Sequence, residues 1–194
     1  MIRFDLPGLI AASRSSVERP RDFARYLLSM KLPLGAASLA LATVALLTAV
    51  LAAIVSLVAL NAGAQGMAQM SPLQWAFLQM AGMFISAGLI AYAGRWFGGI
   101  GDVRGAILLV AWAQFVLLIF QLIQVIVLVL LPPLTPILAL LGIVLSLWLL
   151  VNFIAELHGF ESLIKVFFGI LGVGAAVIFG LATILALVMG GAEM

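Results

Sequence analysis

Two long uncharged stretches constrain the fold of this chain more than any other feature. Residues 32–94 and residues 105–155 contain no Asp, Glu, Lys, Arg or His. The ten residues between them, 95–104, read RWFGGIGDVR and carry three charges in a glycine-rich sequence. Each uncharged stretch is longer than the roughly 20 apolar residues that cross a bilayer. We therefore expect residues 95–104 to form a polar turn at a membrane surface.

The composition supports the same class. Hydrophobic residues make up 66% of the chain and charged residues 8%, whereas about 25% of a soluble domain is charged. So little polar surface cannot coat a globule in water, and lipid is the expected solvent. The chain contains no cysteine, which excludes disulfides and thiolate metal sites. The sequence thus predicts an all-α, polytopic membrane protein.

Counting apolar stretches predicts five transmembrane helices in one bundle. They cover about residues 34–60, 73–94, 106–131, 134–155 and 166–189. A turn-rich, uncharged loop separates the first two spans, and a proline-rich hairpin joins the third to the fourth. The expected organisation is a cytoplasmic amphipathic leader over residues 1–33, followed by a transmembrane domain over residues 34–194.

The basic residues predict the orientation in the membrane. All nine Lys and Arg residues lie in the leader, in the loop 95–104 or in the loop 156–165. With five spans, these three segments share one side of the membrane. By the positive-inside rule that side is the cytoplasm, which places the N-terminus inside and the C-terminus outside.

The leader contains a short amphipathic helix. Pro20 suits the first helical turn, because its missing N–H would be unpaired there. Four apolar residues then fall at i, i+3, i+4 and i+7 on one face: Phe23, Tyr26, Leu27 and Met30. We expect this helix to lie in the headgroup layer with its apolar side toward lipid. The alternative is that the leader packs on the membrane domain.

Polar side chains inside the spans form two stripes. They are Gln114, Gln121 and Gln124 in the third span, and Asn152 and Glu156 in the fourth. Amides in hydrocarbon need partners, so we expect both stripes to face the protein interior, where they could meet. Hydrogen bonding between helices is the simpler interpretation. A polar path, or a headgroup groove entering from the cytoplasmic side, is the alternative.

A stripe of small residues runs along the fifth span. Gly172, Ala176 and Gly180 repeat every four residues, which lets another helix approach closely. We expect packing inside the bundle, with a dimer interface as the alternative.

The charged loops hold the few residues that could carry chemistry. Glu156, His158 and Glu161 share one loop, but without partners elsewhere they predict neither a metal nor a catalytic site. We expect them to form a surface salt-bridge cluster with Asp102 and Arg104 that joins the two loops.

The glycine run Gly98-Gly99-x-Gly101 lacks the preceding strand and the following Lys-Ser/Thr of a phosphate-binding loop, so no cofactor is expected. Basic residues near an anionic leaflet attract its headgroups. Arg95, Arg104 and His158 are therefore the candidates for holding an anionic lipid headgroup or an acidic segment of a partner.

Three segments resemble the Yip1 family of five-span membrane proteins. They are ERPRDFARYLL in the leader, GRWFGGIGDVRGAILLVAW around the first charged loop and AELHGFESLIKVF around the second. The resemblance runs from about Ser16 to the end of the chain and implies a helical bundle with a cytoplasmic N-terminus. Eukaryotic members act in vesicle trafficking and associate with small GTPases, but they carry a long cytosolic region in place of this short leader. The Ala-, Leu-, Val- and Arg-rich usage, with two lysines, favours a bacterial inner-membrane protein.

The sequence thus predicts a non-enzymatic membrane scaffold that organises lipids or partner proteins, including further copies of itself, and no nucleic acid. A small transporter or channel using the Gln and Asn side chains is the first alternative. An accessory subunit of a larger membrane complex is the second.

Overall fold

The computed structural model describes residues 5–61 and 71–190, and every regular element in these ranges is a helix. The elements are α1 (Leu6–Glu18), α2 (Pro20–Ser29), α3 (Leu34–Asn61), α4 (Pro72–Trp96), α5 (Val103–Leu130), the 3₁₀ helix η1 (Pro132–Leu134), α6 (Thr135–His158) and α7 (Leu163–Gly190). The helices α3 to α7 are each long and apolar enough to cross a membrane. The predicted fold class is therefore confirmed. Most of the expected loop over 61–72 lies outside the described residues.

Local sequence explains where the helices begin and end. Asp102 caps α5, since its Oδ1 accepts a hydrogen bond from the Gly105 N–H at 2.9 Å. Gly159 ends α6 in the left-handed conformation, with a φ of 73°, which glycine adopts at little cost. The proline pair after α5 forms η1 and turns the chain directly into α6.

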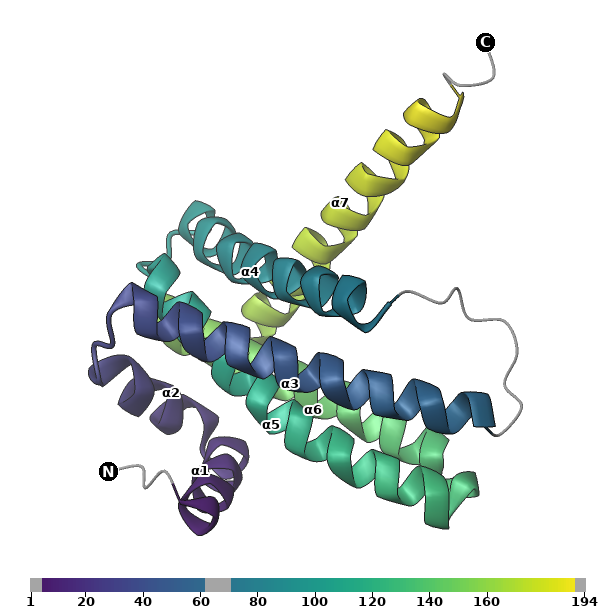
Figure 1. Cartoon of the computed structure of the whole chain (residues 1–194). Helices are drawn as coiled ribbons and strands as arrows, with labels where there is room; N and C mark the ends of the chain where they lie inside the picture. The colour runs from purple at the N-terminus through teal and green to yellow at the C-terminus, as the bar shows by residue number, and fades with distance from the viewer. Residues whose placement is uncertain (1–4, 62–70, 191–194) are drawn as a thin grey trace.

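The helices α3, α5 and α6 lie side by side, and α4 covers part of this layer (Figure 1). Fully buried alanines from three helices belong to one hydrophobic core, among them Ala45 of α3, Ala87 of α4 and Ala106 of α5. Small side chains let these backbones approach closely and gain van der Waals contact. The larger buried residues Leu41 and Leu149 fill the space between them.

The leader packs on the bundle. Phe23 and Leu27 of α2 are 7% and 3% exposed, and the Phe23 ring lies 4.9 Å from the ring of Trp112 on α5. The indole N–H of Trp148 on α6 donates to the carbonyl of Val17 at 3.1 Å. Phe23 and Leu27 of the apolar face therefore contact protein, not lipid, whereas Tyr26 of the same face is 36% exposed. The headgroup-layer prediction is wrong for Phe23 and Leu27, for which the packing alternative is the observed one.

The helix α7 leaves the bundle. Its first turns pack on α6 around Val166, after which it runs away from the other helices at a steep angle (Figure 1). A Cβ atom added at Gly172 or Gly180 would meet nothing within 4 Å, and Ala176 is exposed. The predicted packing of this stripe inside the bundle is therefore wrong, because only the base of α7 is held.

Candidate functional site

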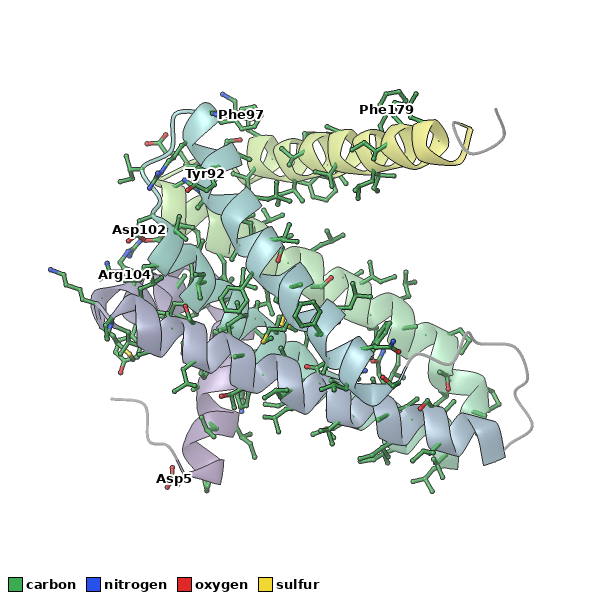
Figure 2. The ribbon with its side chains drawn as sticks, turned by 45° about the horizontal axis from the view of Figure 1, so that its top comes forward. Asp5, Tyr92, Phe97, Asp102, Arg104 and Phe179 are labelled. Atoms are coloured by element: carbon green, nitrogen blue, oxygen red, sulfur yellow. The ribbon has the colours of Figure 1, made fainter. Side chains whose placement is uncertain are left out.

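Three segments gather at one end of the bundle: α2, the α4–α5 loop (residues 97–102) and the α6–α7 loop (residues 159–162). We call this the basic end, because Arg21, Arg25, Arg95, Arg104 and Lys165 lie on or beside these segments. Figure 2 labels Tyr92, Phe97, Asp102 and Arg104 on the side of the molecule where α4 turns into α5.

His158, the only histidine of the chain, lies at the centre of the basic end and is 2% exposed. Its Nδ1 accepts a hydrogen bond from the Gly101 N–H at 3.1 Å. Its Nε2 lies 3.0 Å from the carbonyl oxygen of Ile90. A nitrogen that accepts carries no proton, so this geometry assigns the neutral ring with Nε2 donating. In addition, the Ile100 N–H donates to the His158 carbonyl at 3.3 Å.

Glycines surround the His158 ring. A Cβ atom added at Gly94, Gly99 or Gly101 would overlap the atoms of the imidazole. Only residues without a side chain allow the end of α4 and the α4–α5 loop to close over this ring. We call these three positions the glycine cradle. The glycine-rich segment therefore accommodates the His158 ring, and its sequence has no phosphate-loop pattern.

Glu156 ties the leader to the bundle. The Nε of Arg25 donates to Oε1 of Glu156 at 2.7 Å, and its Nη2 donates to Oε2 at 3.2 Å. The Nε of Arg21 lies 3.3 Å from Oε2, and its Nη2 donates to the Phe160 carbonyl at 3.1 Å. The Glu156 hydrogen bond raises the pKa of Arg25. Glu156, predicted as an intramembrane polar residue, instead forms ion pairs with a segment 131 to 135 residues away.

The two predicted headgroup arginines have local partners. The Nε of Arg95 donates to the Gly101 carbonyl at 2.9 Å, and its guanidinium lies 5.9 Å from the centre of the Tyr92 ring. Arg104 pairs with Asp102 at 3.4 Å, and both remain partly exposed. The expected salt bridge between the loops is absent among the described residues. The loops are joined instead by the bonds to His158.

His158 therefore cannot hold an anionic headgroup, because its ring is buried and both nitrogens have backbone partners. That prediction is wrong. Anion binding by Arg95 and Arg104 stays a prediction.

The intramembrane amides do not meet one another. Gln124 donates to the Leu138 carbonyl at 3.1 Å and so links α5 to α6. Asn152 is 3% exposed and donates to the Trp148 carbonyl of its own helix at 2.8 Å. Gln121 is half-buried on α5, and Gln114 lines a groove described next. The two stripes therefore do not form one polar path.

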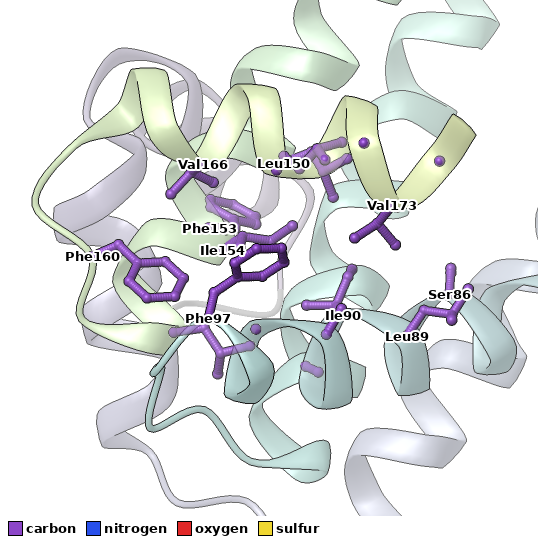
Figure 3. Close-up of a pocket in the computed structure, with 18 of the residues that line it drawn as sticks. Ser86, Leu89, Ile90, Phe97, Leu150, Phe153, Ile154, Phe160, Val166 and Val173 are labelled. Carbon is purple, nitrogen blue, oxygen red and sulfur yellow. The ribbon is translucent and has the colours of Figure 1, made fainter. Parts of the chain in front are cut away.

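A groove of about 1510 Å³ opens between α7 and the helices α4, α5 and α6. Figure 3 shows Phe160 and Val166 at the end where α6 turns into α7, and Ser86 and Val173 at the other end. Apolar side chains form most of its walls. Within residues 5–61 and 71–190, no group of three or more His, Asp or Glu side chains could hold a metal ion.

These features define a polytopic, all-helical integral membrane protein. Hydrogen bonds and ion pairs join its leader and its two charged loops at one end of the bundle. The family model described as the Yip1 domain matches residues 14–184. The chain therefore belongs to the Yip1 family, as the three segments quoted above suggested. Neither a curated protein nor a solved structure matches it.

Proposed function

We propose that this protein is a non-enzymatic scaffold of a bacterial inner membrane, with its basic end in the cytoplasm, that holds lipids or partner proteins. One observation carries the proposal. His158 and Glu156, the residues best suited to chemistry, both have structural partners on other elements. Bonds of this kind fix the shape of the basic end.

The exposed length of α7 supports a role in assembly. Phe179 and Leu187 of α7 are 75% and 71% exposed and do not line the groove. In a membrane, such a helix face gains van der Waals contact by packing against another helix. A second copy of the chain or another membrane protein would supply that helix.

Photo-crosslinking tests the assembly role directly. A photoreactive amino acid at Phe179 should yield an adduct of discrete mass in intact cells. The same residue at Leu39, which is 69% exposed on α3, serves as the matched control and should react with lipid alone. If both positions give the same pattern, α7 is not an assembly surface and the scaffold proposal loses its main support.

A small transporter is the second candidate, favoured by the position of Gln114 in the groove wall. A transport path needs polar groups that reach water, so Gln114→Cys should react with a membrane-impermeant thiol reagent. No reaction at this position would rule out a water-filled path along the groove. An accessory-subunit role would instead appear as a stable larger complex after mild solubilisation.

A further inference from the structure

The groove between α7 and the bundle carries charged residues at one end only. Glu161, Ser162 and Lys165 line it where α6 turns into α7, which is the end marked by Phe160 and Val166 in Figure 3. Beyond that end the walls are apolar, apart from a few uncharged polar side chains such as Ser86 and Gln114. The groove therefore fits a ligand with one charged end and a long apolar body.

The charges at this end are available for a ligand. Glu161 and Lys165 are exposed, and neither forms an ion pair within the part of the chain that the structure describes. They are the only two charged residues among those lining the groove. One anion and one cation together match a headgroup that itself carries an amine and a phosphate.

We propose that this groove binds a single glycerophospholipid with a zwitterionic, ethanolamine-type headgroup. The Lys165 ammonium faces the phosphate, the Glu161 carboxylate faces the amine, and the acyl chains lie along the apolar walls between α4 and α7. This site rests on the proposed scaffold role and specifies the class of lipid that the scaffold holds.

The small-residue stripe contributes to this site. Gly172 and Ala176 line the groove, whereas Gly180 lies beyond it. With no side chain at Gly172, space for an apolar chain remains beside α7.

The size of the groove suits a lipid. It holds about 1510 Å³, which exceeds the roughly 300–1,000 Å³ typical of small-molecule pockets. Its two charged residues lie at one end and its long walls are mostly apolar, as a headgroup and acyl chains require.

Lipid retention in the full chain provides the test. The protein is exchanged from nanodiscs of equal phosphatidylethanolamine and phosphatidylglycerol into detergent, and the bound phospholipid is counted by native mass spectrometry. Gly172→Leu places an apolar side chain in the groove and should lower lipid retention about tenfold. The added side chain displaces lipid contacts of about its own size, and losing that much apolar contact lowers the affinity at least about tenfold. Gly180→Leu is the matched control outside the groove and should retain lipid normally.

The headgroup assignment has its own variants. Lys165→Gln should lower retention of both lipids, whereas Lys31→Gln, at the other lysine of the chain, should not. Glu161→Gln should abolish the preference for phosphatidylethanolamine.

Equal lipid retention by the two glycine variants would overturn the site, and an equal preference for phosphatidylethanolamine before and after Glu161→Gln would overturn the headgroup assignment. A dimer in place of bound lipid, lost in Gly172→Leu, would show that a second copy occupies the groove. The lipid counts are measured on the purified chain, so they can fail while the crosslink at Phe179 succeeds, and the reverse.

Discussion

The imidazole of His158 lies against the backbone of Gly101, whose N–H donates to its Nδ1 at 3.1 Å. This one bond connects the end of α6 to the loop between α4 and α5, which is 57 residues earlier in the chain. The second ring nitrogen faces the Ile90 carbonyl at 3.0 Å. One side chain thus holds three elements in fixed positions.

The glycine cradle predicts a steric effect. Gly94→Ala should destabilise the protein by about 1–3 kcal/mol, because its methyl group would overlap the buried His158 ring. Gly88→Ala on the same helix has open space around its Cβ and serves as the control. It should be neutral or stabilise α4, since Ala favours helix over Gly by about 1 kcal/mol. Thermal unfolding in detergent measures both, and equal melting temperatures would contradict the cradle.

The bond between the leader and Glu156 predicts a difference between two surface arginines. Arg25→Gln should loosen α2, because Arg25 makes two hydrogen bonds to Glu156 across the bundle. Arg14→Gln removes only an exposed i, i+4 pair with Glu18 and should leave α2 unchanged. Limited proteolysis within residues 20–29 compares the two variants, and cleavage should be faster in Arg25→Gln than in Arg14→Gln. Faster cleavage in Arg14→Gln, or in neither variant, would show that Glu156 does not hold the leader.

The proposed orientation, with the basic end in the cytoplasm, predicts which loops are reachable from outside the cell. Leu134→Cys, in the exposed turn between α5 and α6, should react with an impermeant thiol reagent in intact cells. Asp102→Cys, at the basic end, should react only after the membrane is opened. Labelling of Asp102→Cys in intact cells would reverse the orientation.

The spans could be predicted from sequence because the bilayer imposes a length and a solvent that composition alone reveals. Every end of the predicted spans lies within three residues of the corresponding helix end. The largest differences are that α5 and α7 begin three residues earlier and α6 ends three residues later than predicted. The pairing of Glu156 with Arg25 could not be predicted, because it joins residues 131 positions apart. Nothing in the apolar sequence of α7 indicates that it leaves the bundle.

The structural role of His158 has a signal in the sequence, although the sequence predicted headgroup binding for this residue. Gly94 at the end of α4 and Gly99 and Gly101 in the following loop stand close together in a sequence without a phosphate-binding pattern. Such a set indicates close approach of the backbone to something bulky. The sequence contains one histidine, but only the folded arrangement shows that its ring fills the space above these glycines.

The central claim is that the basic end is a rigid structural junction fixed by His158. Hydrogen exchange of the Gly101 amide in nanodiscs tests it most directly, because that N–H bonds to the imidazole itself. The claim predicts slow exchange in the native chain and at least about tenfold faster exchange in His158→Leu, since the lost bond leaves a buried donor unpaired at a cost of about 1–3 kcal/mol. Exchange in the α3 core should stay unchanged. An equal rate at Gly101 in both proteins would contradict the claim.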